Sequence, residues 1–201
     1  MKKIINSKKG EEYSREISDG KRKLEVTLPQ LIKCLQVLKY IIKHYPNPCI
    51  HKVYKLIYLA DRIHLIKYGS LITHNTYFKM EEPIPRLIWW IILSVIKDKS
   101  IFPFNVLTKK EIEVIECPET GRDILHNLTD IDFDYLSESN IECLKLIIAK
   151  YSNYTIDQLT IETQDLIYNS VGNRNFDIDI LDMLNVFEND KQFATNCLQM
   201  C

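Results

Sequence analysis

The chain has 201 residues, of which 46% are apolar, and its 26 Lys and Arg residues nearly balance 27 Asp and Glu residues. A chain of this length can bury a core without a metal or disulfides to stabilise it. The charge balance argues against a domain that coats nucleic acid, because such domains are usually strongly basic. Five glycines and seven prolines argue against a disordered or collagen-like chain. The composition predicts a soluble globular domain.

Residues 1–26 form a charged segment at the start of the chain. Basic and acidic side chains alternate through it, and Gly10 and Gly20 interrupt any helix. We expect a mobile or edge-lying arm here, followed by one domain over residues 27–201. Because the charges are of mixed sign, the pattern favours a solvated arm over one that binds nucleic acid.

Two helices are predicted next. Thr27 precedes Pro29 and Gln30, which is typical of a capped helix start, and the apolar repeat that follows ends before Pro46. A second helix is expected from about residue 51 to residue 67, closing at Gly69. Apolar residues cover most of its circumference, which places it in the middle of the domain.

The middle of the chain contains the predicted β element. Residues 73–80 are rich in β-branched and aromatic residues, and two prolines at residues 83–85 force an extended segment. A Trp-rich helix follows and ends near Lys99. Its apolar run of residues 87–96 is too short for a membrane span, which needs about 20 residues. A further strand is expected at residues 112–116, followed by a turn at residues 118–121.

The remaining chain is again helical. Ser137 and Thr155 read as N-caps of two more helices. From Phe176 onwards an acidic C-terminal helix is expected, with one apolar stripe formed by Ile178, Leu181, Leu184 and Phe187. The predicted fold is mainly α: a single helical domain with a small antiparallel β element.

Motifs of catalysis and metal binding are sparse. No phosphate-binding glycine loop or nucleophile elbow occurs, and the six cysteines form no C-x-x-C pair, so we expect no zinc site and reduced thiols in the cytoplasm. Asp61 and His64 could share a helix face as metal ligands, but no third ligand is indicated, which favours buried polar pairing. Three other pairs of residues could be considered for catalysis: Arg122 with His126, Cys49 with His51, and Glu81 with Glu82. Their spacing favours surface or structural roles instead. We expect no enzyme activity and no cofactor.

A recognition element is the remaining candidate site. Aromatic, Met and Pro residues concentrate around the rigid proline segment at residues 83–85, and such residues are common in protein interfaces. The adjacent carboxylates of Glu81 and Glu82 favour a charged patch that faces a partner. We predict a partner-binding surface formed by Tyr77, Met80, Glu82, Pro83, Ile84 and Trp89. The alternative is that Trp89 and Trp90 simply fill the core.

Several blocks of the sequence resemble the Panacea-domain family, which includes SocA-like antitoxins and phage-associated proteins. The likeness covers roughly residues 28–170. Its most specific blocks are residues 52–69 and 71–85, and weaker ones are residues 134–139 and 159–165. Two positions depart from the family pattern: Glu82 stands where Gly usually precedes Pro83, and Gln164 stands where His is common.

The resemblance implies a helical, non-enzymatic interaction domain, in which the helix at residues 52–67 is scaffold. Family members bind and neutralise toxins, and one branch delivers its toxin to an ATP-dependent protease. We therefore expect an antitoxin-like protein that binds a toxin, encoded on a phage or other mobile element. The alternatives are a proteolytic adaptor that uses the charged arm or residues 197–201 as its second contact, a nucleic-acid-binding regulator that uses the basic residues of the arm, and an enzyme of unknown type.

Overall fold

The structure is a computed structural model that describes residues 14–18, 23–96, 105–117, 121–172 and 177–199. Its helices are α1 (Leu28–His44), α2 (Ile50–Tyr68), α3 (Arg86–Ile96), α4 (Asn105–Glu111), α5 (Glu138–Tyr151), α6 (Ile156–Thr163), α7 (Leu166–Ser170), α8 (Ile180–Asn189) and α9 (Lys191–Gln199), with a 3₁₀ turn at Phe133–Tyr135. The strands are β1 (Ser14–Ser18), β2 (Lys23–Thr27), β3 (Tyr77–Lys79), β4 (Pro83–Pro85), β5 (Ile112–Cys117), β6 (Arg122–Asn127) and β7 (Asp177–Ile178). The described strands form three small antiparallel sheets, β1–β2, β4–β3–β7 and β5–β6. The predicted mainly α fold with a small antiparallel β component is confirmed.

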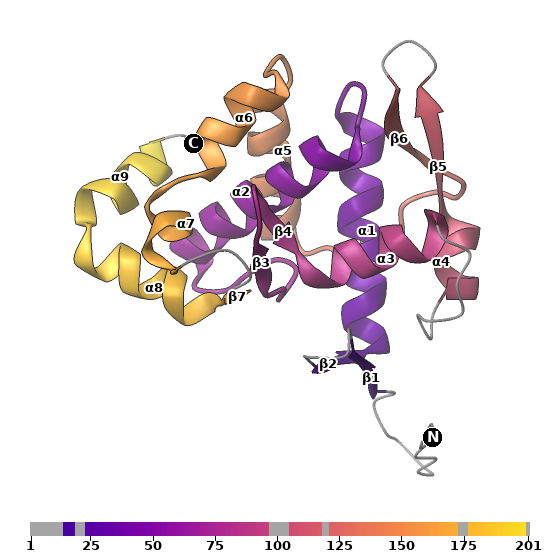
Figure 1. Ribbon diagram of the computed structural model, residues 1–201, viewed down its shortest axis with the longest axis horizontal. Coiled ribbons are helices and arrows are strands. Elements are labelled where there is room, and N and C mark those ends of the chain that lie inside the picture. Colours follow the sequence, from indigo (N-terminus) through magenta and orange to yellow (C-terminus); the bar gives the residue numbers. More distant parts are fainter. Residues whose placement is uncertain (1–13, 19–22, 97–104, 118–120, 173–176, 200–201) are drawn as a thin grey trace.

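Helix α2 lies in the middle of the molecule, with α1 and α3 on one side and the C-terminal helices on the other (Figure 1). It packs against α1, α5, α6, α9 and β4. Its residues from Val53 to Leu65 are all buried, so both its apolar and its polar side chains face other elements. The prediction of a central helix is confirmed, and its end is the expected one: Gly69 has φ +74°, a left-handed conformation that glycine adopts without strain.

The predicted helix starts are confirmed by their caps. The hydroxyl of Thr27 accepts a hydrogen bond from the backbone N–H of Gln30 at the start of α1. Ser137 and Thr155 form capping boxes at the starts of α5 and α6. In each case a side-chain oxygen satisfies a backbone donor that the first helical turn leaves without a partner.

The C-terminal segment differs from its prediction. Ile178 is not helical but belongs to β7, where it pairs with Tyr77 of β3. Helix α8 buries Met183 and Phe187, whereas Leu181 is 63% exposed. Leu184 is exposed as well. The expected apolar stripe is therefore wrong, because the helix starts at Ile180 and packs a face that includes Met183.

Four further segments can be compared with their predictions. Within the predicted arm, β1 pairs with β2 in a hairpin that the sequence did not indicate, and the predicted mobility of residues 1–13 falls outside the described residues. Helix α3 is described as far as Ile96, and its predicted end near Lys99 lies among residues 97–104, which are also outside the described residues. Strand β5 is confirmed, and it pairs with the unpredicted β6. The adaptor hypothesis used residues 197–201 as a second contact. Cys197 of this segment is buried in α9, and residues 200–201 are not described.

Candidate protein-binding site

The β3–β4 hairpin is attached to α2 by a buried carboxylate. Asp61 of α2 is fully buried and accepts hydrogen bonds from the backbone N–H of Thr73 at 3.0 Å and from the hydroxyl of Tyr77 at 2.6 Å. The Thr73 hydroxyl donates to it as well. Burial raises the pKa of the Asp61 carboxyl, and these donated hydrogen bonds oppose the increase. The ring of Tyr77 meets Tyr58 edge to face, with 5.3 Å between ring centroids, so Tyr77 faces the core.

The start of β4 is attached to α2 by a second carboxylate. Glu82 is 6% exposed, and its side chain forms an ion pair with the buried ammonium of Lys55. Its other carboxylate oxygen lies 2.7 Å from Nδ1 of His51, whose side chain is largely exposed. A buried charge is costly unless it is paired, so Lys55 and Glu82 stabilise each other in this position.

The C-terminal helices are attached to α2 by an ion pair. Arg62 and Asp165 are both buried, and the guanidinium donates to the carboxylate at 2.5 Å. The hydroxyl of Tyr58 donates to the same carboxylate at 2.9 Å, and the ring of Phe193 in α9 lies 5.7 Å from the guanidinium carbon. Asp165 also caps α7 by accepting from the N–H of Tyr168. Arg62 of α2 thereby contacts both the N-cap of α7 at Asp165 and the ring of Phe193 in α9.

The two faces of the β3–β4 hairpin differ in burial. Tyr77 pairs with Pro85, and both face the core, whereas Phe78 pairs with Ile84, and both are half-buried. Successive side chains of a strand point to opposite faces, so Phe78 and Ile84 lie together on the face turned away from α2. Trp89 of α3 packs against Phe78, with 6.0 Å between ring centroids and the rings nearly perpendicular. We call Phe78, Ile84 and Trp89 the hairpin face.

A cation and an anion border the hairpin face. The guanidinium of Arg86 lies over the ring of Phe78, 4.2 Å from its centroid, and donates to Asp177 of β7 at 2.5 Å. Asp177 is the residue paired with Phe78 across the sheet. Arg86 itself is only 4% exposed, so the accessible part of this region is its half-buried aromatic and aliphatic residues, a composition typical of surfaces at which proteins bind one another.

The six residues of the predicted partner-binding surface fall into two groups. Tyr77, Glu82 and Pro83 are buried, so the prediction that they are exposed is wrong; Tyr77 and Glu82 point inwards because they bond to α2. Met80, in the turn between the strands, is 43% exposed, and Ile84 and Trp89 are half-buried. Only these three are accessible to a partner in this conformation.

Sequence reasoning missed three residues of this region: Phe78, Arg86 and Asp177. Strict alternation along β3 could have found Phe78, because a strand that buries Tyr77 must turn its neighbour outwards. Arg86 follows Pro85 directly, and nothing in the local sequence indicates that its partner would lie 91 residues further along the chain. Such contacts come from the fold.

The pairs considered for catalysis or metal binding have structural surroundings. His64 has its two ring nitrogens 2.6 Å from the carbonyl oxygen of Ser70 and 3.1 Å from the hydroxyl of Ser139, which agrees with the predicted polar pairing of Asp61 and His64. Arg122 and His126 are exposed on β6. Within the described ranges, no group of three or more His, Cys, Asp or Glu residues is arranged to hold a metal ion.

The thiols nearest to these sites are buried. Cys34 and Cys49 are reduced, and burial beside the Asp61 carboxylate raises the pKa of the Cys34 thiol well above its usual value. A thiol held in its neutral form is a weak nucleophile, so Cys34 acts as a packing residue.

The region that contains α2, the hairpin and the ion pair at Asp165 is also the region shared with known proteins. The family model of the antitoxin SocA-like, Panacea domain matches residues 53–165, more than half of the chain. The chain belongs to this family. No curated protein and no solved structure matches it. Membership indicates a role related to toxin–antitoxin systems.

The two departures from the Panacea pattern have local explanations. Glu82, in place of the usual Gly, provides the carboxylate that pairs with Lys55. Gln164, in place of the usual His, donates a hydrogen bond from its side chain to the backbone oxygen of Glu81 at 2.8 Å. Both therefore hold the hairpin in place. Among the described helices, none has the length and apolar character needed to cross a membrane.

Proposed function

We propose that this Panacea-domain protein is an antitoxin that binds a partner toxin and neutralises it without catalysis. The observation that carries the proposal is the family match over residues 53–165, which covers the central helix, the hairpin and the contact between them. Neutralisation by binding needs a contact surface rather than a set of reacting groups, and we infer that the hairpin face supplies it.

The hairpin face, together with Met80, is the proposed contact surface. The hairpin is attached to α2 at Asp61 and at Lys55, so its geometry is set before a partner arrives. Binding then costs less conformational entropy than binding by a flexible loop, because few backbone torsions remain to be ordered. The half-buried Phe78 and Trp89 offer aromatic area, which contributes strongly to protein interfaces.

Co-expression tests the proposal. The products of the genes next to this one in its native genome are expressed singly in a host, with and without this chain. We expect one of them to arrest growth alone and to permit growth when the chain is present. Growth arrest that is unchanged for every toxic neighbour would refute neutralisation.

The half-life of the toxic neighbour separates neutralisation from proteolytic delivery. It is measured after translation is stopped, with and without this chain. Simple neutralisation leaves the half-life unchanged or longer and produces a stable complex. A half-life that is shortened only when the host's ATP-dependent protease is active would assign the chain as an adaptor instead.

A further inference from the structure

The β5–β6 hairpin has an inner edge that bonds to the rest of the protein and an outer edge that does not. On the inner side, the backbone N–H of Leu125 in β6 donates to the oxygen of Pro48 at 3.2 Å, and Ile124 forms an isolated bridge with Cys49. Strand β6 lies on the side of α1, and β5 is the outer strand (Figure 1). In the part of the chain that the structure describes, β5 has no strand neighbour other than β6.

The register of the hairpin shows which backbone groups of β5 point outwards. The N–H of Leu128 donates to the oxygen of Glu111 at 2.9 Å, and the rest of β5 follows in unbroken antiparallel register. Hydrogen-bonded and non-hydrogen-bonded pairs alternate along such a ladder. Ile115 therefore bonds to β6, whereas Val114 and Glu116 direct their N–H and C=O groups away from it. Among the described residues, no hydrogen bond from another element reaches these outward groups.

Strand β4 has a different kind of edge. The N–H of Arg86 donates to the oxygen of Thr76 at 2.9 Å, so the same alternation directs Ile84 towards β3 and leaves the two prolines of β4 at the outward positions. Proline has no N–H to donate, and it is one of the residues with which natural proteins protect an edge strand. Strand β5 carries neither a proline nor a bulge, so its backbone is able to pair with a further strand.

The outer end of β5 also exposes an apolar side chain. Ile112 at its start is fully buried, whereas Ile115 is 45% exposed. Ile115 pairs with the half-buried Ile124 of β6, and the two form a short apolar row across the hairpin. A strand edge that combines unpaired backbone groups with an exposed apolar side chain is a template for pairing with another strand.

We propose that β5 pairs antiparallel with β5 of a second copy of this chain, across a two-fold axis at Ile115. In this register the outward groups of Val114 bond to those of Glu116 of the partner subunit, and the reverse pairing follows from the symmetry. Ile115 lies opposite its own copy in a non-hydrogen-bonded pair, in which side chains are closest. The apolar rows of the two copies then join into one row across a continuous sheet.

The charges of β5 select this register. A register shifted towards the tip of the hairpin would place Glu116 opposite Glu116 of the partner subunit, and like charges directly opposite are destabilising. A register shifted the other way would place Ile115 opposite Glu113 of the partner subunit instead of an apolar side chain. The formal net charge of the chain is only -1 at pH 7, so two copies repel each other little. A two-fold pairing is also the commonest symmetry of soluble oligomers.

Sedimentation equilibrium of the full chain over a range of concentrations tests the proposal. We expect a reversible equilibrium between the 23.7 kDa chain and a particle of twice that mass. Glu116→Pro removes an outward N–H and leaves the hydrogen bonds between β5 and β6 in place. The symmetry removes this donor from both copies, so we expect the dissociation constant of the dimer to increase at least about ten-fold.

Glu116→Ala is the matched control. It removes the same exposed side chain but keeps the N–H, and its dissociation constant should stay within about three-fold of the unchanged chain. Circular dichroism must show that both variants are folded. A chain that remains monomeric up to about 1 mM, where even a weak dimer would be populated, would overturn the proposal. So would a dimer that both variants weaken equally or that neither weakens.

Amide hydrogen exchange of the ¹⁵N-labelled chain locates the contact. The N–H groups of Val114 and Glu116 should exchange more slowly in a concentrated than in a dilute sample, whereas that of Leu125, bonded to Pro48 on the other edge, should change little. Slower exchange that appears only when a toxic neighbour is added would assign the edge to the toxin and overturn its assignment to a second copy. Because no toxin enters the sedimentation experiment, its failure leaves the proposed neutralisation intact, and failure of the growth test leaves the dimer proposal intact.

Discussion

Replacing Tyr77 by Phe removes one hydroxyl from the buried contact that attaches β3 to α2. The hydroxyl donates to Asp61 at 2.6 Å, and both side chains are fully buried. A hydrogen bond to a charged group contributes about 1.5–3 kcal/mol, and Phe leaves the carboxylate short of one donor. We expect Tyr77→Phe to lower the free energy of unfolding by about 2–3 kcal/mol. For a chain of this size, that corresponds to a decrease in Tm of roughly 4–12 °C.

Urea and thermal unfolding, followed by circular dichroism at neutral pH, measure this loss. Tyr68→Phe is the matched control, because Tyr68 is 43% exposed and its hydroxyl donates to the exposed Glu142 at 2.5 Å. Solvent replaces such a hydrogen bond readily, so the control should unfold close to the unchanged chain. If both variants lose the same stability, or if Tyr77→Phe loses none, the anchoring role of the Asp61 contact is refuted.

Three further predictions concern the same scaffold. Because the folded-state pKa of Asp61 is raised, the native chain binds its proton more tightly than the unfolded chain does, so the stability that this group contributes increases as pH falls through the folded pKa. As the pH is lowered from 7.5 to 5, the urea midpoint of the unchanged chain should therefore rise relative to that of Asp61→Asn. A difference between the two midpoints that does not change with pH would contradict this. Arg62→Met leaves the carboxylate of Asp165 buried without its cation and should lower the free energy of unfolding by about 3–5 kcal/mol. The double variant Arg62→Met with Asp165→Leu should lose less stability in the same urea assay. Gly69→Ala places a side chain at φ +74° where the space is open, so only backbone strain of about 1 kcal/mol is expected, and Gly69→Asn should cost less because Asn tolerates this conformation.

The helices of this fold could be predicted from the sequence because their determinants are local. The caps at Thr27, Ser137 and Thr155 are set by residues within one turn, and the C-terminal cap at Gly69 requires a single glycine. The extended proline segment was predicted for the same reason, since the ring of each Pro fixes its own torsion. These features depend on a few neighbouring residues and would arise in many folds.

The inward or outward direction of the hairpin residues could not be predicted from composition. Tyr77 is buried because its hydroxyl donates to Asp61 of α2, and Glu82 is buried because it pairs with Lys55 of α2. These long-range contacts outweigh the solvent exposure that is usual for residues in and beside a turn. The same holds for the C-terminal segment, where Ile178 joins a sheet built by residues 77–85. Pattern reasoning on a single segment has no access to such long-range partners.

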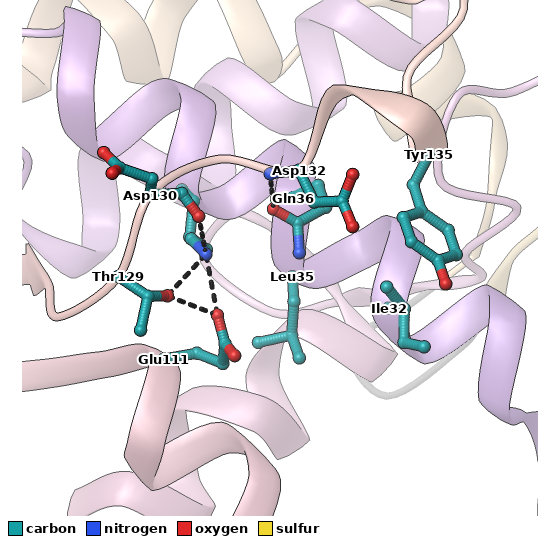
Figure 2. Close-up of a pocket in the computed structure, with 9 residues that line it drawn as sticks. Ile32, Leu35, Gln36, Glu111, Thr129, Asp130, Asp132 and Tyr135 are labelled. Atoms are coloured by element: carbon teal, nitrogen blue, oxygen red, sulfur yellow. Dashed lines mark hydrogen bonds and ion pairs between the residues drawn. The ribbon is translucent and has the colours of Figure 1, made fainter.

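A cavity of about 270 Å³ between α1, the end of α4 and residues 129–135 also escaped prediction (Figure 2). Its residues come from three elements that are separated by up to 103 positions, from Ile32 to Tyr135. Gln36 lies beside the apolar repeat predicted for this helix and not within it, and only the bond from the N–H of Asp132 reveals which way its amide points.

The most direct test of the account is the affinity of the identified toxin for variants of the hairpin face, measured by isothermal titration calorimetry. Ile84→Asp places a charge on that face, and Ile161→Asp is the matched control, because Ile161 is 75% exposed on α6. Tm measurements must first show that both variants are folded. We expect Ile84→Asp to weaken binding by at least about ten-fold, equivalent to about 1.4 kcal/mol, and Ile161→Asp to leave it unchanged. Unchanged affinity in folded Ile84→Asp would contradict the claim that this protein acts through its hairpin face.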